Sequence, residues 1–141
     1  HLITTGSVRA IAEAAGFPTN EASLRDFAKR FRANFLVETA KPFIEDSWRK
    51  VTIGTARFRV AFPCARCILP NVDQATGELN YGVVQALLTS RRVDLLEVQH
   101  VIEQRYFDNL IVKPGEYLFG WYLVLESDPT IISIGNEVVV A

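Results

Sequence analysis

The stretch VTIGTARFRVAFPCARC, residues 51–67, carries the strongest fold signal in the chain. Apolar and polar residues alternate before Gly54-Thr55 and again from Phe58 to Phe62, which predicts a β-hairpin with its turn at those two residues. The hairpin is expected to end at Pro63, where the C-A-R-C segment begins. Both cysteines would then lie in a loop after a strand, a common place for binding and catalytic residues.

Two helices are predicted upstream of this hairpin. From Leu2 to Gly16 the chain has the pattern of a strand end, capping hydroxyls and a helix with apolar residues at the helical period. Asn20 is expected to cap a second helix, whose apolar face is formed by Leu24, Phe27, Ala28 and Phe31. A strand should follow from Phe31 to Val37, and the segment from Pro42 to Asp46 is expected to be a loop.

The second half of the chain is expected to add one helix and two further strand regions. A polar turn is predicted from Asp73 to Gly77, and a helix from Gly82 to about Arg92. Strands are predicted from Leu118 to Leu125 and from Ile131 to Val140, the latter folded at Gly135-Asn136. Between Val93 and Tyr117, branched apolar residues and charges mix without a clean period, so no element is assigned there.

Composition excludes several classes of function. The chain has 141 residues and a net charge of −1, which suits one domain and offers little attraction to nucleic acid. A typical apolar stretch, Tyr117 to Leu125, is far shorter than the roughly 20 residues that span a bilayer, so no membrane span is expected. The chain begins at His1 and has no methionine, which indicates a fragment whose targeting segment would lie upstream. With only two cysteines, an intracellular setting is expected.

The spacing of Cys64 and Cys67 is compatible with several roles. Two thiolates separated by two residues can bind a soft metal, form a redox disulfide or pack as small apolar side chains. Structural zinc normally needs four ligands, and the chain adds only His1 and His100. A thioredoxin-like dithiol normally opens a helix, whereas the sequence after Cys67 looks extended. The cysteine pair alone leaves these alternatives open.

Five short segments occur in an order and spacing that resemble a MOSC domain. They are Arg30–Asn34, Pro42–Trp48, Ile53-Gly54, Pro63–Cys67, and Val72-Asp73 with Thr76–Glu78. The opening Leu2–Ser7 and the late Phe119–Tyr122 are similar to the family's flanking segments. MOSC domains are the molybdenum-cofactor modules of the amidoxime-reducing proteins and of the molybdenum cofactor sulfurases, and the resemblance is closest to the amidoxime-reducing proteins. The stretch from Val93 to Tyr117 looks like an insertion in this pattern.

The resemblance also implies a fold. We expect an α+β domain in which a bent, barrel-like, mixed or antiparallel β-sheet carries a few peripheral helices. Residues 1–141 would form one MOSC domain that lacks the N-terminal β-rich subdomain of the family. Because that subdomain contributes strands and basic contacts to the cofactor phosphate in relatives, its absence would weaken the hold of this chain on the cofactor.

The cofactor site is implied residue by residue. In the MOSC family the second cysteine of the C-x-R-C segment ligates molybdenum, so Cys67 is the expected metal ligand and catalytic centre. A thiolate is a soft donor that suits such a metal. By resemblance, the molybdenum cofactor (molybdopterin) would be held by Thr4, Ser7, Arg32, Asn34, Arg66 and Tyr122. A strand bounded by Phe31 and Phe35 would place its two polar residues on the face opposite these aromatics.

Several of these side chains also have a purely structural explanation. The two hydroxyl residues could serve only as helix caps, and the two residues on the strand could simply face solvent. A structural ion pair would account for Arg66. Glu45 and Asp46 could steer a cationic substrate or act as acids, but a capped polar turn explains them nearly as well. Cys64 is expected to be structural or a redox bystander.

The function implied is that of the cofactor-binding part of an oxidoreductase that removes oxygen from N-hydroxylated compounds. Electrons would come from a partner, which in relatives is a cytochrome b5-type protein or a flavin reductase, because the sequence has no flavin fingerprint, haem motif or iron–sulfur cysteine set. The alternatives are a sulfurase-type carrier of the cofactor and a degenerate MOSC fold kept as a structural subunit. A cytoplasmic or mitochondrial location would depend on the upstream targeting segment.

Overall fold

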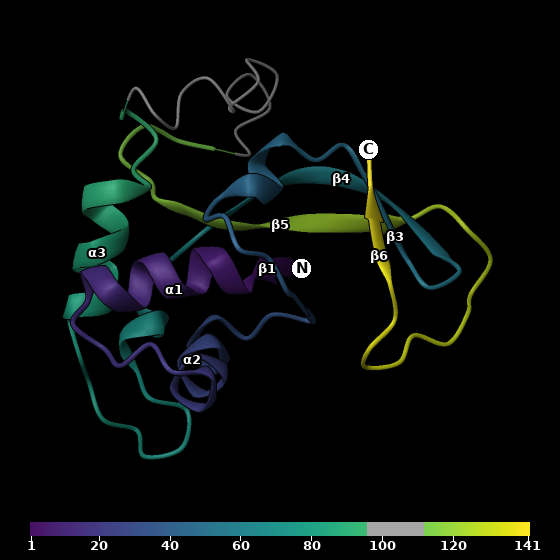
Figure 1. Ribbon diagram of the computed structural model, residues 1–141. Helices are drawn as coiled ribbons and strands as arrows, with labels where there is room; N and C mark the ends of the chain where they lie inside the picture. Colours follow the sequence, from purple (N-terminus) through teal and green to yellow (C-terminus); the bar gives the residue numbers. More distant parts are fainter. Residues whose placement is uncertain (96–111) are drawn as a thin grey trace.

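A computed structural model describes residues 1–95 and 112–141 of the chain (Figure 1). The helices in these ranges are α1 (Thr5–Ala14), α2 (Glu21–Ala28) and α3 (Gly82–Ser90), with short 3-10 turns η1 (Lys29–Phe31), η2 (Ile44–Ser47) and η3 (Leu69–Asn71). The strands are β1 (Leu2–Thr4), β2 (Phe35–Val37), β3 (Lys50–Ile53), β4 (Ala56–Ala65), β5 (Leu118–Leu125) and β6 (Val138–Val140).

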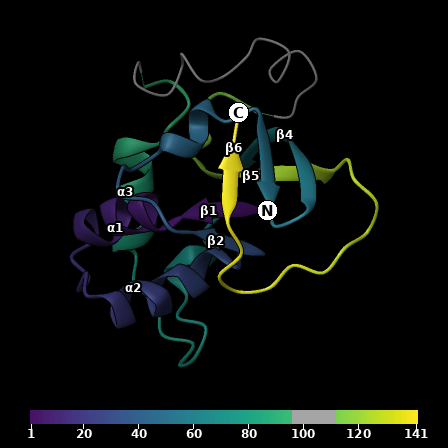
Figure 2. The same ribbon diagram turned by 45° about the vertical axis from the view of Figure 1, so that its right-hand side comes forward.

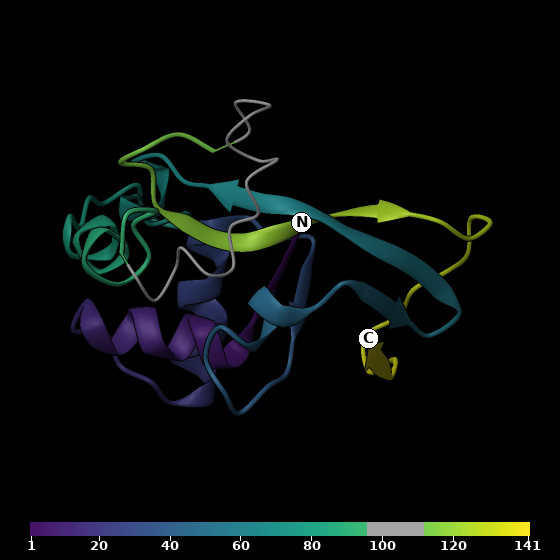
Figure 3. The same cartoon turned by 90° about the horizontal axis from the view of Figure 1, so that it is seen from above.

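The strands form one mixed sheet in the order β2-β1-β5-β4-β3-β6. β1 and β2 are parallel, and every other neighbouring pair is antiparallel. The long strands β4 and β5 curve together along the molecule (Figure 3). Val37 of β2 and Val138 and Val140 of β6 line one hollow of about 320 Å³, so the two edge strands approach each other. The sheet is therefore nearly closed and barrel-shaped, which confirms the expected α+β, barrel-like fold.

The predicted hairpin forms around Gly54-Thr55, but its second strand is longer than expected. β4 continues beyond Phe62 to Ala65 because β5 pairs with it over this whole length. The register shifts on both sides of Pro63, which is how a sheet accommodates a residue that lacks a backbone N–H. Cys64 consequently lies within β4, and the prediction that both cysteines follow the strand is wrong for Cys64.

The three helices gather at one end of the sheet, whereas β3 and β6 lie at the other (Figure 1). Thr4 caps α1 and Asn20 caps α2, as predicted, each accepting a hydrogen bond from a backbone N–H three residues later. The core has two parts. Ile3 of β1 belongs to the part that packs against the helices, and its neighbour Leu2 belongs to the part between the strands, because successive residues of a strand face opposite sides.

Two strand predictions are wrong in part. Phe31 ends η1 and Arg32 has a left-handed backbone with φ of 52°, so β2 begins only at Phe35. Within the region Ile131–Val140, only its last three residues form a strand (Figure 2). The reason is that β3 is four residues long and one of its edges already pairs with β4, which leaves one short edge for β6.

The region from Val93 to Tyr117, which looks like an insertion, is described only at its two ends. Residues 96–111 lie outside the described residues. At the ends, Val93 donates a backbone hydrogen bond to Glu116, and Arg92 forms an isolated bridge with Tyr117. The stretch therefore leaves and re-enters the domain at one place. None of the helices in the described ranges is long and apolar enough to cross a membrane.

Candidate functional site

Cys64 and Cys67 occupy different environments at the end of β4. The Cys64 side chain is buried, with only 3% of it exposed, whereas Cys67 follows the strand and is exposed. Within residues 1–95 and 112–141, no group of three His, Cys, Asp or Glu side chains is placed to hold a metal ion. His100, the second histidine considered for zinc, lies outside the described residues. A zinc site built from protein ligands alone therefore has no support in the described structure.

A hollow of about 310 Å³ lies beside the C-A-R-C segment. Its walls come from that segment, from the η1 turn and the residue after it, from the first residues of η3 and from β5. Arg30, Arg32 and Arg66 line it together with Cys64 and Cys67, and its lining includes no carboxylate among the described residues. A concave surface with cations and no acids favours anionic ligands.

Arg66 is the most buried cation of this pocket that lacks a carboxylate partner among the described residues. Its Nε donates to the carbonyl oxygen of Phe119 at 2.9 Å, and its Nη1 donates to that of Phe31 at 3.0 Å. Burial lowers the pKa of Arg66 below its usual value, and the nearby thiols and phenol partly oppose this effect. The predicted alternative of an ion pair for Arg66 is therefore wrong within the described structure, because two carbonyl oxygens and the His1 ring nitrogen contact its guanidinium.

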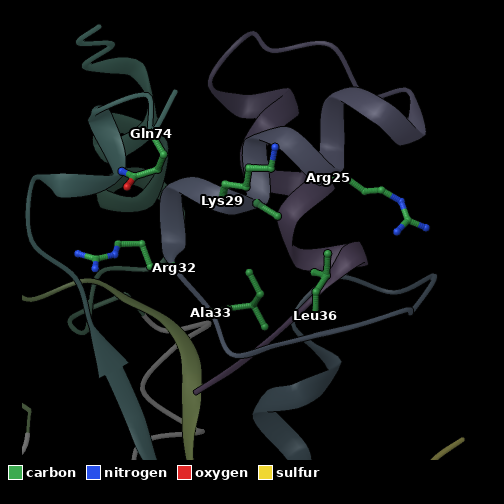
Figure 4. A pocket seen from close by; sticks show the side chains of 8 residues that line it. Arg25, Lys29, Arg32, Ala33, Leu36 and Gln74 are labelled. Atoms are coloured by element: carbon green, nitrogen blue, oxygen red, sulfur yellow. The ribbon is translucent and has the colours of Figure 1, made fainter. Parts of the chain in front are cut away.

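Arg32 lies between this pocket and a second hollow of about 460 Å³ on the side of α2. Figure 4 shows the second hollow, in which the Arg32 side chain extends away from Arg25 and Lys29. Arg25 and Lys29 pair with acidic residues of α2, and no carboxylate among the described residues pairs with Arg32. The unpaired charge of Arg32 is thus available to a ligand in the pocket beside Cys67. A left-handed backbone, rather than a strand, aims it there.

Asn34 and Tyr122 lie at the border of the pocket near His1. The Asn34 side-chain oxygen accepts a hydrogen bond from the amino group of His1, and Asn34 itself is absent from the pocket lining. Tyr122 does line the pocket, with its ring 4.8 Å from the ring of Phe62. A hydrogen bond with the Cys64 side chain raises the pKa of the Tyr122 phenol above its usual value. Tyr122 therefore links the buried thiol to the open side of the pocket.

Thr4 and Ser7 lie elsewhere, beneath the N-terminus of α1. Both are fully buried, and the Thr4 hydroxyl lies 3.0 Å from both the Ser7 hydroxyl and Glu45 Oε2. The Ser7 hydroxyl also accepts a 2.7 Å hydrogen bond from the backbone N–H of Phe43. Because the chain's own Glu45 occupies this helix terminus, the structure does not bring the two hydroxyls to the arginine-lined pocket. Their predicted role as cofactor ligands stays a prediction.

Glu45 and Asp46 face the interior rather than solvent. Burial raises the pKa of Glu45 above its usual value. Asp46 accepts hydrogen bonds from Arg91 and from the indole N–H of Trp121. Both side chains are less than 10% exposed, so they are not placed to steer a substrate from solution. The polar turn that explained them from the sequence is η2, in which these two residues are buried while Ile44 and Ser47 are exposed.

The structure thus brings together four of the seven predicted site residues: Arg32, Arg66, Cys67 and Tyr122. Asn34 lies next to them through His1. Arg30 was missed as a site residue, although it is the first arginine of the R-F-R segment that was recognised. Its signal was the repeat of arginine on both sides of Phe31, because residues two positions apart face the same side of an extended segment.

Comparisons with known proteins identify the family of this chain. The model of the MOSC domain matches residues 1–139. The molybdenum cofactor sulfurase of Homo sapiens is 35% identical over 116 residues, which cover 82% of this chain and 11% of that protein. The molybdenum cofactor sulfurase of Bos taurus is 34% identical over 122 residues, which cover 86% of this chain and 11% of that protein. The molybdenum cofactor sulfurase of Anopheles gambiae is 50% identical over 56 residues, which cover 40% of this chain and 7% of that protein. The chain therefore spans about a tenth of the length of these relatives, and by its match over nearly all residues it belongs to the MOSC domain family.

Proposed function

We propose that this chain binds the molybdenum cofactor, with the Cys67 thiolate as the protein ligand of the metal. The observation that carries the proposal is the exposed Cys67 beside a pocket whose described lining has three arginines and no carboxylate, with only Arg30 of the three paired to a carboxylate outside the lining, Asp73. The cofactor combines a soft, thiophilic metal with an anionic phosphate and a polar heterocycle, so it needs a soft donor and cations together. The residues of this pocket fit both needs.

Each pocket residue has a role in this proposal. Arg32 has no carboxylate partner among the described residues and would contact anionic oxygens of the cofactor. Arg66 holds its carbonyl partners and would contribute its charge from behind the thiolate. Tyr122 would cover the heterocycle from β5, and Asn34 would border the same side through His1. When bound, the metal supplies exchange of oxygen or sulfur atoms between itself and a small molecule.

Within this function, a carrier role of the sulfurase type is favoured. The relatives reported above carry the name molybdenum cofactor sulfurase, and this chain corresponds to about a tenth of their length. A domain of this kind would hold the cofactor while another part of a longer protein acts on the metal. The exposed position of Cys67 suits such a role because the metal side of the cofactor would remain accessible from outside the domain.

The second candidate is an oxidoreductase that removes oxygen from small N-hydroxylated compounds. The observation in its favour is the open, partly apolar border of the pocket, where Leu69 is half exposed. An apolar rim beside an accessible metal could hold the organic part of such a substrate. In this case, electrons would come from a separate donor, a cytochrome b5-type protein or a flavin reductase.

Metal and pterin analysis tests the proposal. The full chain is produced in cells that make the cofactor, and its molybdenum is measured by elemental analysis and its pterin by fluorescence after oxidation. We expect metal in the parent chain and in Cys64→Ser, and loss of metal in Cys67→Ser. Equal metal content in the two cysteine variants, each folded by circular dichroism, would contradict the role of Cys67.

A second assay separates the two candidate roles. The loaded chain is mixed with a cofactor-free molybdenum enzyme, and separately with benzamidoxime and a chemical electron donor. Transfer of cofactor without reduction of benzamidoxime supports the carrier role. Reduction of benzamidoxime that is lost in Cys67→Ser supports the oxidoreductase role.

A further inference from the structure

Arg30 connects the segment that follows Cys67 to the η1 turn. Its Nη2 lies 2.7 Å from Asp73 Oδ2, and its Nη1 donates to the carbonyl oxygen of Asn71 at 3.1 Å. The same Nη1 lies 3.5 Å from the carbonyl oxygen of Pro70. One buried guanidinium therefore contacts three acceptors within four consecutive residues.

The same turn also holds the segment that precedes Cys67. The carbonyl oxygen of Phe31, the next residue after Arg30, accepts the hydrogen bond from Arg66. The residue after that, Arg32, lines the pocket and has no carboxylate partner in the described part of the chain. The η1 turn is thus in contact with the chain on both sides of Cys67, and Arg32 follows it directly.

Apolar burial only weakly holds the two residues directly after Cys67. Ile68 is 68% exposed and Leu69 is 50% exposed, so neither side chain anchors the segment in the core. Hydrogen bonds to charged groups in partly buried sites contribute more than neutral ones, and a planar guanidinium fixes direction as well as distance. Further on, Pro70 and Asn71 are buried, and Asn71 accepts hydrogen bonds from the backbone N–H groups of Asn80 and Val84. These contacts join the segment to α3, whereas the polar contacts with Arg30 join it to η1.

We propose that Arg30 is a positioning residue, which holds the Cys67 segment against η1 and thereby sets how Cys67 faces Arg32 across the pocket. Its effect on cofactor binding rests on the proposed function, whereas its effect on the placement of Cys67 does not. A purely structural role is the competing explanation, because Arg30 also lies over the Phe17 ring at 5.1 Å. The test must separate the placement of Cys67 from global stability.

Asp73→Asn is the sharpest variant because the two oxygens of Asp73 do different work. Oδ1 accepts from the backbone N–H groups of Ala75 and Thr76, and an asparagine oxygen can do the same. Oδ2 pairs with Arg30, and this ionic contact is lost in the variant. Arg30→Lys is the second variant, since lysine keeps the charge but cannot contact the same three acceptors at once.

Asp26→Asn is the matched control. It removes the carboxylate partner of Lys29, the residue that precedes Arg30 in the same turn, from an exposed pair with an N···O distance of 2.9 Å. The chemical change is the same as in Asp73→Asn, and the altered pair is also with a cation of η1. Among the described residues, no hydrogen bond or ion pair joins Asp26 to the Cys67 segment.

The placement of Cys67 is measured by fluorine NMR of a trifluoromethyl label on its sulfur. The full chain carries Cys64→Ser so that only Cys67 is labelled, and thermal unfolding of each variant is recorded separately. We expect one resonance in the parent and in Asp26→Asn, and a broadened or split resonance in Asp73→Asn and Arg30→Lys below their unfolding temperatures. A single, unshifted resonance in both of these variants would overturn the proposal.

The measurement is independent of metal loading. If the unlabelled parent chain binds no molybdenum, the proposed function fails while the fluorine spectra still report on Arg30. If the parent binds molybdenum, we expect Asp73→Asn to lose more of it than Asp26→Asn. Equal metal content in these two folded variants would show that Arg30 does not act through Cys67.

Discussion

Arg91 and Asp46 form a buried ion pair in which Arg91 Nη2 lies 2.8 Å from Asp46 Oδ2. Arg91 follows α3, and its Nε also donates to the carbonyl oxygen of Leu118 in β5. Asp46 belongs to η2, and its Oδ1 accepts from the Trp121 indole at 2.9 Å. The pair thus joins the end of a helix, a turn and the central strand of the sheet. Removal of one partner would leave the other charge buried.

Asp46→Ala is therefore expected to lower the free energy of unfolding by about 3–5 kcal/mol. Urea unfolding followed by tryptophan fluorescence measures the change. Asp26→Ala is the control, since it breaks an exposed pair and should change stability by less than about 1 kcal/mol. Similar losses in the two variants would mean that the Arg91 pair contributes no more than a surface contact.

Glu45 should make stability depend on pH in one direction. Burial raises the folded-state pKa of this carboxyl above its unfolded value, so the folded state holds the proton more tightly. The free energy of unfolding contributed by Glu45 is then fully present below the unfolded pKa, and it is lost as pH rises through the folded pKa. Urea unfolding of the parent and Glu45→Gln from about pH 4 to about pH 8 measures this contribution. The stability difference between the two chains should change in favour of Glu45→Gln as pH rises, and a difference that is constant across the range would contradict the prediction.

Gly120 is expected to tolerate no side chain. Its φ is 82°, and a Cβ at this position would lie 2.6 Å from the carbonyl oxygen of Leu2 and 2.7 Å from Ile3 Cγ2. Gly120→Ala should lower the free energy of unfolding by more than about 2 kcal/mol. Gly77→Ala separates backbone strain from steric clash, because Gly77 also has a positive φ but no atom lies within 4 Å of an added Cβ. This variant should lower the free energy of unfolding by only about 1 kcal/mol. Thermal unfolding measures the stability of both variants, and equal losses of stability would exclude the steric clash at Gly120 as the cause.

Arg66→Lys should destabilise the chain although it preserves charge. The guanidinium of Arg66 joins the carbonyl oxygens of Phe119 and Phe31, and the single nitrogen of lysine cannot reach both in the same geometry. A loss of about 1–3 kcal/mol is expected from one unsatisfied buried carbonyl. Arg59→Lys is the control and should be nearly neutral, because Arg59 is an exposed arginine of β4 that pairs with Glu126. Urea unfolding measures the free energy of unfolding of both variants. A change for Arg66→Lys as small as that for Arg59→Lys would show that a lysine can replace these contacts.

Local patterns predicted most of the elements, because they act over a few residues. The caps Thr4 and Asn20, the turn at Gly54-Thr55 and the helix beginning at Gly82 were all identified in the sequence, and each lies where it was predicted. The segment that contains Cys67 and the other MOSC-like segments indicated the family, which the comparisons confirmed. Side-chain period, capping and turn chemistry determined these features by themselves.

Only the tertiary structure decided which residues meet. The MOSC-like pattern predicted that Thr4 and Ser7 would lie with the pocket residues. In the structure they face Glu45, which lies 38 residues or more further along the chain. Arg32 was predicted on a strand, but Phe31 packs in the helical core at the end of the η1 turn, and Arg32 after it has a left-handed backbone. Burial of charged groups and long-range hydrogen bonds depend on contacts between distant segments. No local pattern contains those contacts, so the arginine-lined pocket beside Cys67 is a property of the folded chain.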